Sequence, residues 1–406
     1  MEIVILTREY PPHTYGGAGV HVEYLTRELA ALGRNEDQIK VLCFGDQHIN
    51  EGNLTVTGIS SEFQPPFQEP RHRGFMNTLL NNVVMVGTIQ RADIIHCHTW
   101  YSHLAGVLAK QISEAPLVLS THSLEPHRPW KEEQLGTAYR GSSWIEKTAY
   151  ENSDGVIAVS QAMKKDVQDL YHVASDKIRV IHNGIDLREY QFTHDDTLIR
   201  SFDIDPEKPF VLFVGRITRQ KGIIHLVNAI RYLNSGIQVV LCAGAPDTEE
   251  ISYEMEQAVE KAKKESDIPI VWIPRVLPKN EVITLYSHAA LFVCPSVYEP
   301  FGIINLEAMA CETPVVASAV GGIPEIVVPE ETGLLVPFEA VNQNNFEPKN
   351  PEKFSRDLAE AVNRVLSNEE KLHFMGRKSR ERVEKYFSWQ SVARRTREFY
   401  EDLRKN

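Results

Sequence analysis

Short runs of β-branched and other apolar residues alternate along this chain with longer segments of helical periodicity. In the first half the strand candidates are EIVILT, IKVLCF, DIIHCH, PLVLST, GVIAVS and IRVIHN. In the second half they are FVLFVG, QVVLCA, IPIVWI, ALFVCP and TPVVAS. Continuous apolar character is typical of strands that are buried on both faces of a parallel sheet. The pattern therefore predicts an α/β protein with right-handed crossover helices.

The strand–helix pattern occurs twice, so we expect two domains. A chain of 406 residues is too long for one typical core. Residues 182–209 are polar, rich in turn-forming residues and end in prolines, which predicts the junction. We expect one domain to span residues 1–183 and the other to span residues 184–387.

The tail of the chain reads as helices. RKSRERVEKYF and ARRTREFYEDLRKN interleave charged and apolar residues at helical spacing, which favours a solvated face over a binding role. No strand remains for this tail to join. We therefore expect residues from about 388 to 406 to pack back on the N-terminal domain.

Composition and charge limit the classes of molecule that we expect this protein to bind. Hydrophobic residues make up 42% and charged residues 24%, as in ordinary globular proteins. The net charge of −12 argues against nucleic acid as a partner, because phosphate backbones are held by Lys and Arg. The five cysteines are scattered in apolar contexts, which indicates buried thiols in a reducing compartment. MEIVILTREYPP lacks a signal-peptide pattern and no apolar run reaches about 18 residues, so we expect a cytoplasmic protein without a membrane partner.

The stretch YEPFGIINLEAMA places two carboxylates around a Pro-Phe-Gly bend. Glu299 precedes the bend, and Glu307 lies in a segment that should be a largely buried helix. A buried carboxylate is costly without hydrogen-bond partners, so the pair indicates a ligand site. The alternative is a charge at the start of the helix together with one half-exposed surface glutamate. Gly302 frees the backbone at the helix start, where the N–H groups of Ile303 and Ile304 can bind phosphate oxygens. Carboxylates accept hydrogen bonds from hydroxyls, so the stretch suits a sugar nucleotide.

The stretch FVGRITRQKGIIHLV carries two cations directly after a strand. Arg216 and Lys221 should lie in the loop or in the first helical turn. A cation at a helix N-terminus opposes the helix dipole, so two cations there predict an anion between them. A diphosphate fits this position, and two solvated cations are the alternative.

The glycine-rich stretch YPPHTYGGAGVHVEYLTREL follows the first strand. Gly16, Gly17 and Gly19 allow the backbone to approach a ligand where a helix starts. It is not a dinucleotide fingerprint, because G-x-G-x-x-G needs a glycine where Val22 stands. An ordinary strand-to-helix turn explains the glycines equally well.

The stretch LSTHSLEPHRPWKEEQLG places His122 at the carboxyl end of a strand. Open α/β sheets bind ligands at that end, although a lone histidine is more often structural. His127, Arg128 and Lys131 follow closely and could meet an acceptor phosphate or be solvated. We assign them to the acceptor side.

Two other stretches look like metal sites. His96, His98 and His103 in HCHTWYSH suggest ligands, but the first two alternate along a strand edge and no carboxylate or cysteine pair completes the set. The D-x-D of residues 203–205 precedes Pro206 in the expected junction and reads as a surface turn. We therefore expect no metal site and no cofactor.

Together the motifs resemble the retaining GT-B glycosyltransferases of family 4. The E-x7-E pair, the GR…KG loop and the NGID turn match across nearly the whole chain. The stretches YPPHTYGGAGVHVEYLTREL and THSLEPHRPWKEEQLGTAY are similar to the short actinobacterial-type glycogen synthases, a group that includes maltose-1-phosphate synthases. E-x7-E is shared by many families, whereas HSLEPxRPWKxEQLG is specific.

The resemblance implies two Rossmann-like domains that face each other across a deep cleft. The N-terminal domain would hold the acceptor and the C-terminal domain the nucleotide sugar. The implied reaction moves glucose from a nucleotide sugar, usually ADP-glucose in this group, to a glucan end or to glucose 1-phosphate. The anomeric configuration would be retained and the new bond would be α-1,4, as in glycogen biosynthesis.

The resemblance also implies a role for most of the candidate residues. Arg216 and Lys221 hold the diphosphate. Glu307 holds the nucleotide ribose, and Glu299 contacts the hydroxyls of the donor glucose. His122 lies beside the donor sugar near the anomeric carbon. No residue suits the nucleophile of a double displacement, so the family suggests a front-face mechanism in which the leaving phosphate deprotonates the acceptor.

Three further positions are implied to border the donor: Gly16, Gly17 and Asn183. One departure separates the chain from the longer starch and glycogen synthases, which carry K-x-G-G-L near the N-terminus. Tyr15 stands at the equivalent position here, so no lysine reaches the phosphate from that loop.

Four alternatives stay open from the sequence. A family 4 enzyme with a lipid acceptor needs a basic amphipathic patch, and FMNTLLNNVVMVGTIQRAD has few charges. A sugar-nucleotide 2-epimerase shares the architecture and needs no acceptor. A dehydrogenase needs an acid at the end of the second strand, where IKVLCFGDQ offers only Asp46 after a glycine. A non-catalytic carbohydrate-binding protein would not need both phosphate cations and paired acids.

Overall fold

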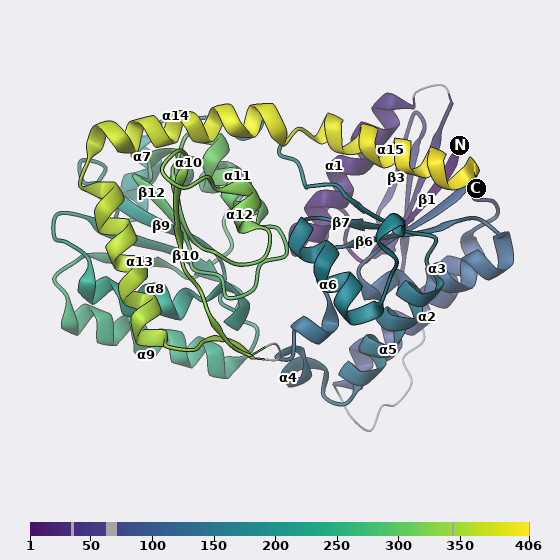
Figure 1. Ribbon diagram of the computed structural model, residues 1–406, viewed down its shortest axis with the longest axis horizontal. Coiled ribbons are helices and arrows are strands. Elements are labelled where there is room, and N and C mark those ends of the chain that lie inside the picture. Colours follow the sequence, from purple (N-terminus) through teal and green to yellow (C-terminus); the bar gives the residue numbers. More distant parts are fainter. Residues whose placement is uncertain (34–35, 62–70, 343–344, 406) are drawn as a thin grey trace. The chain divides into compact units, whose positions relative to one another are not determined.

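Each half of the chain folds around its own parallel sheet (Figure 1). A computed structural model describes residues 1–33, 36–61, 71–342 and 345–405. The chain divides into two units: unit 1 comprises Met1–Gly184 and Trp389–Asn406, and unit 2 comprises Ile185–Ser388. The chain crosses from unit 1 to unit 2 after Gly184 and returns to unit 1 after Ser388, in each case one residue beyond the expected boundaries at 183 and 387. The first crossing lies at the start of the expected junction segment.

Unit 1 contains an eight-stranded sheet in the order β3-β4-β2-β1-β5-β6-β7-β8. Its neighbours are parallel except β3 and β4. The strands are β1 (Glu2–Leu6), β2 (Gln38–Phe44), β3 (His48–Glu51), β4 (Leu54–Ile59), β5 (Ile94–His98), β6 (Leu117–Thr121), β7 (Gly155–Ala158) and β8 (Ile178–Val180). The α-helices are α1 (Gly17–Leu32), α2 (His72–Thr88), α3 (Trp100–Ser113), α4 (Lys131–Leu135), α5 (Ala138–Asn152), α6 (Gln161–Tyr171) and α15 (Trp389–Lys405).

Unit 2 contains a six-stranded sheet in the order β11-β10-β9-β12-β13-β14, and a separate antiparallel pair. The strands are β9 (Phe210–Arg216), β10 (Gln238–Gly244), β11 (Ile270–Ile273), β12 (Leu291–Cys294), β13 (Val315–Ser318), β14 (Gly333–Val336), β15 (Ala340–Asn342) and β16 (Asn345–Pro348). The α-helices are α7 (Asp196–Ser201), α8 (Ile223–Ala229), α9 (Glu249–Glu265), α10 (Lys279–His288), α11 (Ile303–Ala310), α12 (Ile323–Ile326), α13 (Pro351–Leu366) and α14 (Glu369–Tyr386).

The expected α/β class with two Rossmann-like sheets is confirmed. All the strands predicted from apolar runs form, and the central residues of most are buried, as in Val4, Val118 and Val240. The exceptions are β8 and β11, whose central residues are only partly buried. One run ends early: IRVIHN was expected to be strand to residue 183, but β8 stops at Val180. Beyond the strand, Gly184 packs closely against the start of α15, since a Cβ there would lie 2.8 Å from the backbone nitrogen of Trp389.

The last helix returns to unit 1, as expected. α15 packs against α1, and the Trp389 ring stacks on Tyr24 with centroids 5.4 Å apart. Its buried residues are spaced for one helical face: Trp389, Val392, Ala393, Thr396, Phe399 and Tyr400. Arg397 on this helix donates to Asp37 at 2.7 Å. The charges of the tail thus lie beside a buried apolar stripe rather than forming a wholly solvated helix.

Local chemistry fixes the helix ends of unit 2. Thr248 accepts a hydrogen bond from the Ile251 N–H at the start of α9. The negative charges of Glu249 and Glu250 in the first turn interact favourably with the positive end of the helix dipole. Lys263 lies in the last turn, at the negative end. In the part of the chain that the structure describes, no helix is long and apolar enough to cross a membrane.

Candidate active site

The carboxyl ends of two adjacent strands bring Lys221 and Glu299 together. Lys221 ends the 3-10 turn η3 (Arg219–Lys221) after β9, and Glu299 follows β12. The Lys221 Nζ lies 2.7 Å from Glu299 Oε2, and the Ser296 hydroxyl donates to the same oxygen at 3.2 Å. Burial alone would lower the pKa of Lys221, but the neighbouring Glu299 carboxylate outweighs it and the pKa is raised. The lysine is therefore a fixed cation.

A tight turn sets the position of this lysine. The Thr218 hydroxyl accepts the Lys221 N–H at 3.2 Å, which caps the turn. Gly222 follows with φ +60°, and a Cβ there would lie 2.1 Å from the Pro295 carbonyl oxygen. The glycine is thus required both by its backbone conformation and by close approach to the loop after β12. This contact explains why a lysine distant in sequence reaches Glu299.

Helix α11 begins beside the same pair. Gly302 has φ +103°, and a Cβ there would lie 2.6 Å from Asn305 Nδ2 and 3.2 Å from Glu299 Cγ. The expected helix over Ile303–Ala310 is present with those bounds. Ile303 and Ile304 form its first turn, where backbone N–H groups have no carbonyl partner within the helix. A cation, an acid and a helix N-terminus therefore share one corner of unit 2.

Glu307 has partners that the sequence did not reveal. Its two carboxylate oxygens accept hydrogen bonds from the Tyr190 hydroxyl at 3.0 Å and the Tyr286 hydroxyl at 3.1 Å. Burial raises the pKa of Glu307, and the two tyrosine hydroxyls partly oppose that rise. The side chain is half-buried, and a carboxylate has further lone pairs, so it can still accept a ligand hydroxyl.

Arg216 differs from the expectation in both place and partner. It is the last residue of β9 instead of lying in the loop or helical turn, because the strand continues its pairing with β10 to Gly244. Its guanidinium forms an ion pair with Asp247, a nearly buried acid after β10. The Arg216 side chain remains 47% exposed, so it can still reach an anion.

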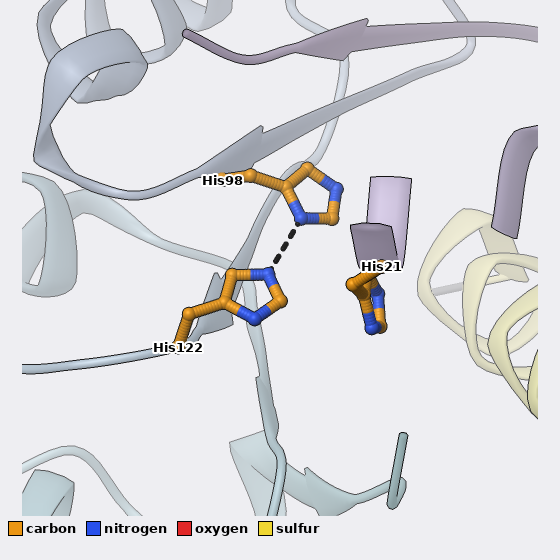
Figure 2. Close-up of side chains that lie close together, drawn as sticks. All are labelled: His21, His98 and His122. Carbon is orange, nitrogen blue, oxygen red and sulfur yellow. Dashed lines mark hydrogen bonds between the residues drawn. The ribbon is translucent and has the colours of Figure 1, made fainter. Parts of the chain in front are cut away.

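In unit 1, His122 belongs to a cluster of histidines (Figure 2). His122 follows β6, His98 ends β5, and His21 comes from α1. The Nδ1 of His98 lies 2.9 Å from the Nε2 of His122, a hydrogen-bond distance. The His21 ring approaches edge-on, with its centroid 4.7 Å from that of His122.

The cluster is neutral. Burial lowers the pKa of His21 to about 4, and it lowers the pKa of His98 and of His122 well below the ordinary histidine value. The Nδ1 of His21 lies 2.7 Å from Asn183 Oδ1, so this nitrogen carries the proton and Nε2 bears a lone pair. Asn183, expected beside the donor, is buried and orients His21.

The metal-like stretch HCHTWYSH does not form a ligand set. The two nitrogens of His96 lie 2.6 Å from the Tyr400 hydroxyl and 2.9 Å from the Ser120 hydroxyl, so both are used. In unit 1, the described residues whose ligand atoms lie within 4.8 Å of one another are His21, His98 and His122. Two of those histidines already share a direct hydrogen bond, which serves to fix His122.

The glycine-rich loop binds a carboxylate of its own unit. Gly16 precedes α1, and Glu9 Oε2 accepts the N–H groups of Tyr15 and Gly16, each at 2.9 Å. Gly17 is the first residue of α1. The N–H groups of the loop thus bind the Glu9 carboxylate, a partner that the sequence did not reveal. Whether phosphates replace this carboxylate stays a prediction.

Two of the acceptor-side candidates, His127 and Arg128, are each paired with an acid. His127 Nδ1 lies 3.4 Å from Asp166 Oδ2, and Arg128 Nη1 lies 3.6 Å from the buried Glu125. Their side chains are 15% and 20% exposed, so neighbouring groups cover most of each. A contact with an acceptor phosphate stays a prediction. Lys131 begins α4 and is half-buried.

A second acid lies behind this loop. Glu146 on α5 accepts the Glu125 N–H at 2.8 Å and the Tyr171 hydroxyl. Burial, and then repulsion from Glu125, raise the pKa of Glu146 to about 8. An acid with a raised pKa in the folded state binds its proton more tightly there than in the unfolded state. The free energy of unfolding should therefore fall as pH rises from about 4.5 to about 8.

Glu146→Gln should remove this pH dependence. The amide oxygen can accept both hydrogen bonds, and the variant cannot acquire a buried charge. Relative to the wild type, the variant should gain more than about 1 kcal/mol in free energy of unfolding between pH 5 and pH 8.5. Urea unfolding at both pH values measures the gain. Glu151→Gln, an exposed acid on the same helix, should show none; an equal shift in both variants would contradict the buried-acid explanation.

Several residues of the candidate site were missed from the sequence: Glu9, His21, Tyr190, Asp247 and Tyr286. Some signal was present, since His21 lies in the glycine motif and Tyr190 lies just after the NGID turn. Asp247 follows the end of a predicted strand, the position at which ligands and their partners gather.

Comparison with known protein families gives two adjacent matches. The model of Glycosyltransferase Family 4 matches residues 15–189, and the model of Glycosyl transferases group 1 matches residues 194–382. The two matches meet close to the crossing from unit 1 to unit 2, and together they span most of the chain.

Similar proteins were found among curated proteins and solved structures. An alpha-maltose-1-phosphate synthase of Mycolicibacterium smegmatis is 41% identical over 98% of this chain and 99% of the relative. A glycogen synthase of Mycobacterium tuberculosis is 26% identical over 98% of this chain and 94% of the relative. The structure of sucrose-phosphate synthase from Thermosynechococcus elongatus superposes with a TM-score of 0.77 at 25% identity and covers 99% of each chain.

Proposed function

This chain belongs to the family 4 glycosyltransferases with the GT-B fold, and from that premise we propose that it transfers glucose from ADP-glucose to glucose 1-phosphate. The product would be maltose 1-phosphate with an α-1,4 bond and a retained α configuration. Identity of 41% along the whole length of a maltose-1-phosphate synthase supports this acceptor.

The corner formed by Lys221, Glu299 and the start of α11 carries the proposal. A nucleotide sugar has a diphosphate beside a hexose, so it needs a cation and hydrogen-bond donors next to a hydroxyl-binding acid. Lys221 is a fixed cation, α11 offers first-turn N–H groups, and Glu299 lies 2.7 Å from the lysine. Arg216 would add a second cation for the diphosphate.

Cleavage of the donor builds negative charge on the departing diphosphate. Preorganised donors that point to such charge lower the barrier because they need no reorganisation during the reaction. Lys221 and the α11 N-terminus supply them in this chain. Glu299 would accept hydrogen bonds from donor glucose hydroxyls, and Glu307 from the ribose. Because Tyr190 and Tyr286 already hold both oxygens of Glu307, the acid is oriented before the nucleotide arrives.

The neutral histidine cluster suits a contact with an uncharged sugar. His122 would place a hydrogen-bonding nitrogen beside the donor glucose without adding a positive charge. His98 holds one of its nitrogens, and Asn183 fixes the tautomer of His21. The cluster is thus a rigid support for His122.

Elongation of a glucan is the second candidate, favoured by the whole-length match to a glycogen synthase. The test offers radiolabelled ADP-glucose with glucose 1-phosphate and with glycogen in separate reactions. Label in a disaccharide phosphate supports the first proposal, and label only in polymer supports the second. If neither product carries label, both proposals are overturned. UDP- and GDP-sugars would then be tested as donors, followed by an epimerase assay without an acceptor.

Chelation should leave the rate of transfer unchanged. The charges proposed for the leaving group belong to the protein, namely Lys221 and Arg216, so the chemistry needs no added cation. The measurement is kcat/KM in excess EDTA against buffer alone. Loss of activity that Mn²⁺ or Mg²⁺ restores would show that a metal shares the diphosphate with these side chains.

A further inference from the structure

A group of metal-ligating side chains lies in unit 2 apart from the residues discussed above. His194 and Asp196 flank the start of α7, and His288 is the last residue of α10. One ligand atom from each lies within 4.8 Å of the others. The sequence analysis did not single out these residues, because His288 is far from the other two along the chain.

The distances within the group fit one ion. Asp196 Oδ1 lies 3.4 Å from His194 Nε2 and 3.3 Å from His288 Nε2. Ligands about 2.0–2.1 Å from a tetrahedral zinc ion lie about 3.3–3.4 Å from one another. The carboxylate oxygen is thus already spaced from each imidazole nitrogen as two ligands of one ion would be. One ligand atom of His194 lies within 4.8 Å of one of His288.

The tautomer of His288 favours coordination. Its Nδ1 lies 3.0 Å from the Thr284 carbonyl oxygen, so this nitrogen is the donor. In the neutral ring Nε2 then bears a lone pair, which accepts a long hydrogen bond from the Asp195 N–H at 3.4 Å and also faces the carboxylate of Asp196 at 3.3 Å. Two lone pairs at this distance repel each other unless a proton or a metal ion lies between them. A backbone carbonyl on the other ring nitrogen is also the usual support of a metal-binding histidine.

We propose that His194, Asp196 and His288 bind one divalent cation of the Zn²⁺ class. Two imidazoles and one carboxylate suit zinc, cobalt and nickel, whereas Mg²⁺ and Ca²⁺ prefer sets made of oxygen alone. His288 is 8% exposed and anchors the site, while His194 is 68% exposed and leaves a side open to water as the fourth ligand.

The ion would join two helices near the first crossing into unit 2. α7 follows that crossing, and the Thr193 N–H already donates to Ser287 on α10 at 3.0 Å. Tyr286 on the same helix donates to Glu307. The ion would therefore fix α10 and, through Tyr286, help to position Glu307, the residue proposed to hold the ribose. Its role is structural, so the readouts are binding and melting temperature rather than turnover.

Titration of the full-length, metal-free protein with Zn²⁺, and with Co²⁺ as a spectroscopic probe, tests the site. We compare the wild type with His194→Ala and with His373→Ala. His373 is a matched control, because it is 67% exposed and pairs with Glu369 as His194 pairs with Asp196. Both substitutions lie on exposed side chains, so both variants should fold.

The wild type and His373→Ala should bind one Zn²⁺ more tightly than His194→Ala does, and Zn²⁺ should raise their melting temperature. Loss of an outer partner typically weakens metal binding about 10- to 100-fold, so loss of a direct ligand should weaken it at least about 100-fold. Co²⁺ should give the visible absorption of a tetrahedral site. Equal Zn²⁺ binding by His194→Ala would assign the ion to another group, such as His21, His98 and His122. That result, or no binding by the wild type, overturns the proposal.

Discussion

Replacing Lys221 with alanine should lower kcat/KM by about 100- to 1,000-fold. The lysine is the half-buried cation proposed to stabilise the leaving diphosphate. Loss of one preorganised donor typically costs about 2.7–4 kcal/mol of transition-state stabilisation. The fall should appear mainly in kcat, because the charge develops in the transition state. Steady-state rates of glucosyl transfer from ADP-glucose measure it.

The same substitution leaves Glu299 without its partner, so stability must be separated from catalysis. Breaking a buried ion pair by removing one side typically costs about 3–5 kcal/mol, enough to unfold a marginal protein. The double variant Lys221→Ala/Glu299→Gln removes both charges and should recover much of the stability without recovering the activity. Arg219→Ala is the matched control, because Arg219 lies in the same turn but points to Glu254. Near wild-type turnover in a folded Lys221→Ala would refute the phosphate role.

His122→Ala should lower kcat by about 100-fold with little change in KM for the nucleotide sugar. The imidazole is held by His98 at 2.9 Å, so it adds a preorganised hydrogen-bonding group beside the donor sugar. Because burial lowers the pKa of His122 well below its ordinary value, the wild-type kcat should show no inflection near pH 6.5 from this residue. A pH–rate profile with both enzymes tests both statements.

The variant His98→Gln distinguishes the proposed contact of His122 with the donor sugar from the support that His98 gives to His122. It removes the ring that holds His122 but keeps His122 itself, so we expect a smaller fall, of about tenfold, with the same KM. An equal loss in the two variants would show that the cluster acts by packing alone. Circular dichroism spectra and melting temperatures confirm that each variant is folded before its rates are compared.

The fold could be predicted because buried parallel strands leave a strong signal. Runs such as FVLFVG and VVLCA have no polar position that could face water, and they lie in β9 and β10. The strands missed were those without such a run: LTVTGI alternates apolar and polar residues in β4, and β14 has only GLLV. β4 lies beside the antiparallel edge strand β3 and is buried at alternate positions, while β14 is an edge strand of only four residues. Neither pattern is easily distinguished from that of a loop.

The candidate site was predictable where a single segment carries it. Gly302 and the start of α11 lie in one continuous stretch with Glu299, so local rules sufficed. Partners from distant segments were not predictable: Asp247 for Arg216, and Tyr190 for Glu307, depend on which strands and loops are neighbours. Arg216 was placed outside its strand because no pattern marks the residue at which pairing with β10 ends.

The return of α15 to unit 1 sets an order for folding during synthesis. Unit 2 is continuous in sequence, and its ends meet where the Ile185 N–H donates to the Phe387 carbonyl at 2.9 Å. Unit 1 begins first but lacks Trp389 against Tyr24, and Tyr400 against His96, until α15 has left the ribosome. Unit 2 can therefore complete its folding before unit 1 does. In a chain truncated before residue 389, unit 1 should lack α15 and expose the apolar surface of α1 that this helix covers.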